Sequence, residues 1–189
     1  RISMPVVTRA QLQAEGKPAP VDKITPERAS QLLVEMAQEA LEQARGMQAQ
    51  ATAGQDELAR FVSDSQALVY IAQIYQHQIQ AALGKRLTQL TGRAEFENQL
   101  LDNEKASVEI YKKLAALTAR TYLAATDIHL FWFDVNWPQG LADYKLELAQ
   151  QTQAVALMRW ERQARADKDL HWIMTTDMQG DWRVGRDVT

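Results

Sequence analysis

The sequence predicts an all-α protein, namely an antiparallel bundle of about four long helices with an extended lead-in and an irregular, aromatic-rich tail. Ala, Gln, Leu, Glu and Arg dominate its 189 residues, with only 8 glycines and 5 prolines, and these abundant types favour helices. Apolar residues also recur at three- and four-residue steps over long stretches, as in amphipathic helices. The expected organisation is a lead-in over residues 1–24, a bundle over 25–166 and a tail over 167–189.

The lead-in is expected to be extended because it carries three prolines, Pro5, Pro18 and Pro20. Each proline restricts its own backbone and disfavours helix at the residue before it. A helix could form locally around residues 8–15, where Gly16 would stop it.

The first long helix has a clear start. Thr25 can cap free backbone N–H groups, Pro26 suits the first helical position, and Glu27 faces the positive end of the helix dipole. The helix is expected to fade near Gly54, with Gly46 as an earlier alternative end. Apolar residues at helical spacing predict one amphipathic stripe along it: Leu33, Met36, Ala37, Ala40, Leu41, Ala44 and Met47.

Two further helices are expected over residues 56–91 and 94–122. Gly92 is well placed to end the first of them in the left-handed conformation. Residues 63–65 (Ser-Asp-Ser) could cap a restart, so this stretch is either one helix or two. Its apolar residues again recur at helical spacing: Leu58, Phe61, Val62, Leu68, Val69, Ala72, Tyr75, Ile79, Leu83, Leu87 and Leu90.

The character of the chain changes over residues 127–140, which are rich in aromatic residues and poor in helix signals. A fourth helix is expected over 141–166. The tail, 167–189, is expected to be irregular or to hold a short strand or helical turn. An α-solenoid of two helical hairpins would produce a similar pattern, so it remains an alternative to the bundle.

Charge and composition exclude several function classes. A net charge of −3, with no block of five or more Lys or Arg, argues against nucleic-acid binding. No apolar run approaches the roughly 20 residues that a membrane-spanning helix needs. The absence of cysteine removes disulfides, thiolate metal sites and thiol catalysis. The chain opens with Arg1 and no apolar signal stretch, so we expect a processed product or an excised piece of a longer protein.

No residue is predicted to be catalytic, to bind a cofactor or to bind a metal. His77 is followed by Gln78 and belongs to no Glu-x-x-His or His-Glu-x-x-His pattern, so we interpret it as a polar surface residue. Neither a Gly-x-Ser-x-Gly motif nor a glycine-rich phosphate loop occurs. Glu35, Glu39 and Glu42 share one helix face, which is usual for a solvated surface.

Four aromatic residues are candidates for contact with a sugar or a protein partner: Phe131, Trp132, Phe133 and Trp137. An exposed ring offers a flat apolar face that loses little entropy on binding. The simpler explanation is that these rings fill the core, because large aromatic side chains are mostly buried. In a fragment, they could also pack against a missing domain.

The order of three segments resembles a helical accessory region near the C-terminus of large bacterial proteins related to polysaccharide-degrading glycoside hydrolases. Arg1-Ile2-Ser3-Met4-Pro5 is similar to its lead-in, and Thr25-Pro26-Glu27-Arg28-Ala29 with Leu32 to its helix start. The long helix of that region is matched by Asp64, Ala67-Leu68, Tyr75, Ile79-Gln80-Ala81-Ala82 and Thr91-Gly92. Gln78 and Gln80 stand where that region has basic residues, and Tyr111 stands near its usual Trp. The resemblance covers about residues 1–122.

The resemblance implies a non-catalytic module of an exported carbohydrate-active enzyme, which supports the catalytic domain or its cleft. Its expected partners are that neighbouring domain or another protein, and a polysaccharide, with no nucleic acid and no membrane span. The expected location is periplasmic or extracellular, while a cytoplasmic location stays open. The alternative is a stand-alone helical interaction or scaffold protein that self-associates or binds a partner through apolar helix faces.

Overall fold

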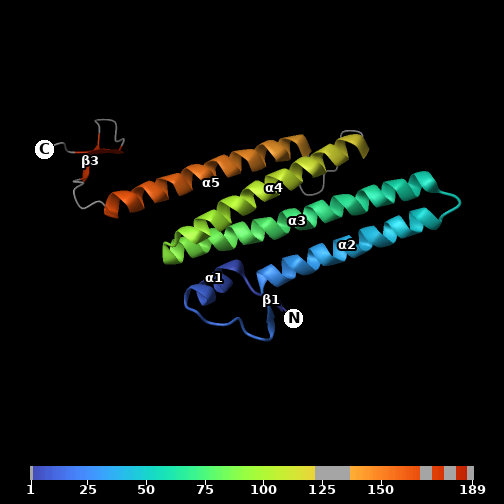
Figure 1. Cartoon of the computed structure of the whole chain (residues 1–189), viewed down its shortest axis with the longest axis horizontal. Coiled ribbons are helices and arrows are strands. Elements are labelled where there is room, and N and C mark those ends of the chain that lie inside the picture. The colour runs from blue at the N-terminus through green and yellow to red at the C-terminus, as the bar shows by residue number, and fades with distance from the viewer. Residues whose placement is uncertain (1, 122–136, 167–171, 177–181, 187–189) are drawn as a thin grey trace. The chain divides into compact units, whose positions relative to one another are not determined.

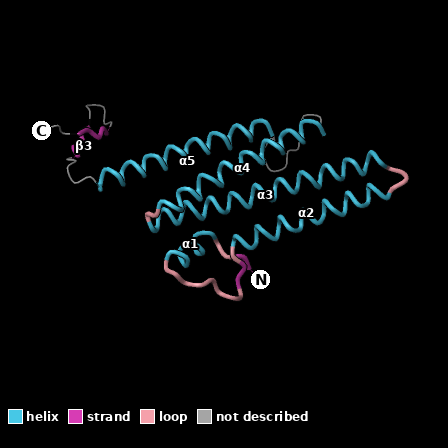
Figure 2. The backbone as a smooth tube through the Cα atoms, viewed as in Figure 1, coloured by secondary structure: helices cyan, strands magenta, loops and turns pink. Residues whose placement is uncertain are grey.

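The computed structural model describes residues 2–121, 137–166, 172–176 and 182–186. Helices dominate these residues, as the composition predicts (Figures 1 and 2). The chain divides into two compact units, residues 1–150 and 151–189, and α5 belongs to both. The elements are β1 (Ile2–Ser3), α1 (Val6–Ala14), β2 (Lys23–Ile24), α2 (Pro26–Gln50), α3 (Gln55–Thr91), α4 (Ala94–Thr121), α5 (Trp137–Ala166), β3 (Trp172–Thr176) and β4 (Trp182–Arg186).

The lead-in is not extended throughout, because the local helix that the sequence allows around residues 8–15 is present. It contains α1, which starts directly after Pro5 and is followed by Gly16 with a φ of 68°. Ala10 of α1 is fully buried in a cluster with Leu83 and Leu87 of α3. Burial of this apolar side therefore stabilises a helix of only 9 residues, which would be marginal in isolation. The short strands β1 and β2 pair in parallel on either side of α1 along the chain.

The predicted start of α2 is confirmed. The side chain of Thr25 accepts a hydrogen bond of 3.3 Å from the backbone N–H of Arg28, and Pro26 occupies the first helical position. The helix continues through Gly46 and ends at Gln50. A left-handed residue, Gly54, then precedes α3.

The structure answers whether the next segment is one helix or two, because α3 runs without a break from Gln55 to Thr91. Ser63 and Ser65 do not cap a restart. The Ser65 hydroxyl donates to the carbonyl of Phe61 within the same helix, and the Ser63 hydroxyl bonds to Thr121 of α4. The helix ends at Gly92 with a φ of 68°, as predicted.

Helices α3 and α4 are antiparallel neighbours. Three side-chain hydrogen bonds join the two helices: Ser63 with Thr121, His77 with Asn103, and Gln80 with Gln99. The residue numbers rise along α3 while those of their partners fall along α4. Gly84 brings the two backbones close, since a Cβ added there would lie 2.9 Å from the Leu100 nitrogen and 3.0 Å from the Phe96 oxygen. The close crossing explains why glycine is placed inside this helix.

Helix α5 begins at Trp137, earlier than the expected start at residue 141. In the second unit, β3 and β4 form an antiparallel hairpin in which Met174 pairs with Val184. Of the alternatives expected for the tail, the structure has strands, which occupy ten of its residues. The closed four-helix bundle stays a prediction.

Candidate functional site

The α3–α4 interface holds polar side chains that bond from one helix to the other. His77 accounts for the clearest pair, with 2.8 Å between its Nδ1 and the Oδ1 of Asn103. The Asn103 amide nitrogen donates to the Gln99 carbonyl, which directs Oδ1 towards the imidazole and requires the Nδ1–H tautomer. The interpretation of His77 as a simple surface residue was therefore incomplete, because this side chain bridges two helices.

Glu104 of α4 is a buried charged residue that bonds to α3. Only 4% of it is exposed, and its Oε2 accepts a hydrogen bond of 3.2 Å from the Gln78 amide of α3. The same amide nitrogen donates to the Ser107 hydroxyl, which in turn donates to the Glu104 carbonyl. Burial raises the pKa of the Glu104 carboxyl, and the negative charge of Glu147 on α5 raises this pKa further.

An aromatic cluster lies where the first half of α5 packs against α3 and α4. The Tyr111 ring lies 4.6 Å from the Tyr144 ring and 6.1 Å from the Trp137 ring, measured between centroids. Burial is the main cause that raises the pKa of both tyrosines. Gly140 allows this approach, because a Cβ there would collide with the Tyr111 hydroxyl.

The four aromatic candidates for sugar or partner contact divide into two groups. Trp137 is half-buried and packs against the core cluster around Tyr111, which agrees with the packing explanation. Its role in contact with a sugar or partner stays a prediction. The other three, Phe131, Trp132 and Phe133, lie outside the described residues.

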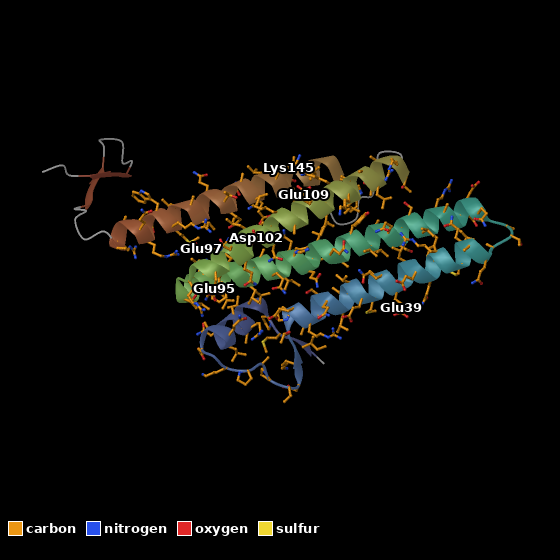
Figure 3. All side chains as sticks on the ribbon, in the orientation of Figure 1. Glu39, Glu95, Glu97, Asp102, Glu109 and Lys145 are labelled. Atoms are coloured by element: carbon orange, nitrogen blue, oxygen red, sulfur yellow. The ribbon has the colours of Figure 1, made fainter. Side chains whose placement is uncertain are left out.

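The carboxylates of α2 behave as expected for a solvated face. Glu35, Glu39 and Glu42 are all exposed, and Glu39 lies on the side of α2 away from α3 in Figure 3. Within the residues that the structure describes, no three His, Asp or Glu side chains are grouped so that they could hold a metal ion. Among the same residues, none of the helices has the length and apolar character needed to cross a membrane.

The largest departure from the sequence prediction concerns the apolar residues of α2, which do not form one buried stripe. Val34, Leu41 and Ala44 are buried. Leu33 and Met36 are instead 51% and 65% exposed, and Met47 is also largely exposed. The apolar residues of α2 therefore form two rows, of which one faces the core and one faces outward.

Helix α3 repeats this arrangement. Its buried residues Val69 and Ala72 belong to the core, whereas Phe61, Leu68 and Tyr75 are about half exposed or more. These three residues recur at seven-residue steps and so lie along one side of the helix. An apolar row exposed to this extent is unusual on a helix that packs against neighbours on other sides.

The two exposed rows lie on the same face of the α2–α3 hairpin. Leu33 directly precedes the buried Val34, and Leu68 directly precedes the buried Val69. One residue turns an α-helix by about 100°, so each row lies roughly a quarter turn from the line between the helices. Helices α2 and α3 lie side by side and are joined by a short loop at one end, so they run in opposite directions (Figure 1). The same step in residue number therefore rotates both rows towards the same face. We call these six residues the apolar strip: Leu33, Met36, Met47, Phe61, Leu68 and Tyr75.

Helix α4 packs on the opposite face of this hairpin. The α3 residue that bonds to α4, His77, directly follows Gln76, which shares the helical row of the buried Val69. Leu68 comes one residue before this row, and His77 comes one residue after it. His77 is therefore rotated in the opposite sense from Leu68 and points to the other face of the hairpin. The apolar strip is consequently not covered by α4.

The comparisons with known proteins concern the fold. No protein-family model matches the sequence, and no curated protein matches it. Among solved structures, the chain is similar to a protein described as a GH138 enzyme targeting pectin rhamnogalacturonan II. The TM-score is 0.72 at 18% sequence identity, and the match covers 82% of this chain. The chain spans only 24% of the length of that protein, and at this identity the similarity establishes a shared helical fold.

Proposed function

We propose that this chain is a non-catalytic helical module of a larger glycoside-hydrolase-like protein, where it supports the catalytic domain or its cleft. The apolar strip is the observation that carries the proposal. Half-exposed Leu, Met, Phe and Tyr side chains along two adjacent helices favour coverage by another protein surface. The partner that fits is a neighbouring domain of the same polypeptide.

The structural similarity supports this choice of partner. The neighbour is a GH138 enzyme, and a helical region like the present chain makes up about a quarter of it. The resemblance of residues 1–122 to an accessory region of polysaccharide-degrading proteins leads to the same class of protein independently. We also propose that the whole protein is exported to the periplasm or the cell exterior, where polysaccharides are found.

The intact mass of the natural gene product tests whether the chain is a module. The 189-residue chain has a mass of 21.4 kDa. We expect the natural product to be several times heavier. A natural product of 21.4 kDa would contradict the proposal and leave the stand-alone alternative.

The proposal also includes a direct contact with a polysaccharide, which would be made by Trp132 and Trp137. Isothermal titration against plant and algal glycans would compare the chain with a variant that carries both Trp132→Ala and Trp137→Ala. We expect the double change to abolish any heat of binding that the unmodified chain gives. Binding that is unaltered in the variant would remove both rings from the proposal.

The same strip also favours a second function, that of a helical scaffold that self-associates. In that case two copies would cover each other's strips, and sedimentation equilibrium would give a defined dimer or higher oligomer. A Met36→Gln and Leu68→Gln double variant should then return to a monomer. A monomeric unmodified chain would exclude this alternative.

A further inference from the structure

The two rows of the apolar strip have the same spacing. On α3, a step of seven residues separates three exposed side chains: Phe61, Leu68 and Tyr75. On α2, the same step separates three others: Leu33, Ala40 and Met47. Each row is about 21 Å long, since a helix rises 1.5 Å per residue. A seven-residue repeat is the spacing with which one helix packs along another.

Hydrogen bonds between α2 and α3 show which positions of the two helices lie level. Near the loop, the Gln55 side chain donates to the Gln48 carbonyl over 3.2 Å. Further from the loop, the Arg45 side chain donates to that of Gln66 over 3.0 Å. This register brings each exposed residue of one row within about one helical turn of a residue of the other row. The pairs are Met47 with Phe61, Ala40 with Leu68, and Leu33 with Tyr75.

The strip therefore presents three successive levels of paired side chains along two antiparallel helices. A third helix that lies along the strip meets each level once every seven residues. Ala40 is the smallest of the six residues, so the middle level has room for a large side chain of the partner. The spacing thus favours a helix as the partner.

The charged side chains beside the strip on α3 are acidic. Glu57 and Asp64 are exposed, and they lie one helical turn before Phe61 and Leu68 on the same side of the helix. Arg60 directly precedes Phe61 and is turned about 100° away from it. Carboxylates therefore lie closest to the row, and they favour basic groups on the partner.

The exposed arginines of α2 lie away from the strip. Arg45 directly follows the buried Ala44 and bonds to Gln66, so it lies on the opposite face of the hairpin. Arg28 forms an ion pair of 3.0 Å with Glu35. A second copy of this chain would thus bring no basic side chain beside its own strip, and a partner of different composition fits better.

We propose that the surface which covers the apolar strip is one amphipathic helix of the neighbouring domain. Its apolar side chains recur in a seven-residue pattern over about four turns, the length of the strip, and lysine or arginine side chains flank them. The apolar side chains fill the three levels, and the basic ones lie near Glu57 and Asp64. The inference rests on the proposed function, because it names the part of the neighbouring domain that docks.

Photo-crosslinking in the natural gene product tests the helix. Three single variants carry p-benzoylphenylalanine in place of Leu33, Phe61 or Tyr75, and mass spectrometry identifies the residues that crosslink to each. All three should reach one segment outside this chain. Leu33 and Tyr75 lie level and should reach one end of it, while Phe61 should reach residues about 14 positions away. The control position is Glu42, which is exposed on α2 away from the strip and should not reach this segment.

The crosslinks separate this inference from the proposed function. Crosslinks to segments far apart in the sequence of the neighbouring domain, as in a sheet or a set of loops, would overturn the helix and leave the proposed function standing. Crosslinks that stay within this chain, or that join two copies of it, would overturn both.

Two synthetic peptides of about 21 residues test the charge of the partner, since this length spans the strip with a margin. Both carry leucines in a seven-residue pattern, flanked by lysine in one and by glutamate in the other. Fluorescence anisotropy with the 189-residue chain should show the lysine peptide binding at least about threefold more tightly at low salt.

Charge variants of the chain make the peptide test specific. Glu57→Gln with Asp64→Asn should narrow the difference between the two peptides. The matched control removes two exposed carboxylates elsewhere, with Glu42→Gln and Glu109→Gln, and should keep the difference. Equal affinities for the two peptides, no binding of the lysine peptide, or an equal effect of both double variants would contradict a basic helix.

Discussion

The two sides of α3 differ in what they bury. The side that faces α4 is closely packed, with Gly84 at the crossing and hydrogen bonds that fix one register, such as His77 with Asn103. The side that belongs to the apolar strip leaves Leu68 and Tyr75 more than half exposed. A helix thus completes its fold on one side and keeps apolar surface available on the other, which is the arrangement expected of a part that is assembled into something larger.

The largest difference should appear when one leucine is truncated on each side. Leu114 of α4 is fully buried against the α3 cluster, whereas Leu68 is 56% exposed. Leu114→Ala should reduce the free energy of unfolding by about 2–5 kcal/mol, because it leaves a cavity. Leu68→Ala should cost less than about 1 kcal/mol. Urea denaturation at equilibrium measures both, and equal losses would mean that the two sides do not differ.

Gly84 offers a sharper test of the close crossing. Gly84→Ala should destabilise the protein by about 1–3 kcal/mol, because the new Cβ meets backbone atoms of α4 that cannot move aside cheaply. The matched control is Gly46→Ala in α2, where a Cβ meets nothing within 4 Å. That change should stabilise the helix by about 0.5–1 kcal/mol. The comparison fails if both substitutions shift the urea midpoint in the same direction.

The hydrogen bond between His77 and Asn103 should be measurable as a coupling energy between these two side chains. A double-mutant cycle with His77→Ala and Asn103→Ala should give a coupling of about 0.5–1.5 kcal/mol, the usual contribution of a hydrogen bond. The control cycle combines His77→Ala with Glu39→Ala, since Glu39 is exposed on α2 and lies away from α3. Coupling in the control, or none between His77 and Asn103, would contradict the assignment.

The smallest effect on stability should come from the strip itself. Replacement of Met36 and Leu68 together by Gln should change the free energy of unfolding by no more than about 0.5 kcal/mol per site. The same change should lower the binding of the fluorescent dye ANS to the folded chain, because it removes exposed apolar surface. The control variant carries Val21→Gln and Leu146→Gln, which alter exposed apolar residues outside the strip. It should keep the ANS fluorescence that comes from dye bound to the strip.

Much of the helical framework could be predicted from the sequence because its signals are local. The start of α2 depends on Thr25 and Pro26, and the end of α3 depends on Gly92, and each acts within one helical turn. A local helix around residues 8–15 with a stop at Gly16 could also be predicted. Its burial could not, because Ala10 packs on Leu83 and Leu87, which are far away along the chain. A short strand in the tail was one of the options expected, but the pairing of β3 with β4 was not predicted, because the tail carries no long periodic pattern.

The candidate surface was less predictable. Leu33 and Val34 are adjacent apolar residues, and composition cannot tell which of them faces the core when a helix has a broad apolar side. Glu104 was likewise indistinguishable from the many solvated carboxylates on helices, because only its burial and the hydrogen bond from the Gln78 amide set it apart. Both features arise from packing between helices, which the sequence of one chain encodes only indirectly.

The most direct test of the docking role is hydroxyl-radical footprinting of the strip in the natural gene product and in the isolated 189-residue chain. We predict that modification of Met36, Phe61 and Leu68 falls several-fold in the natural product, where another domain covers them, while the fully exposed Val21 is modified equally in both. Equal modification of the strip in the two samples would contradict the claim that this face is a docking surface.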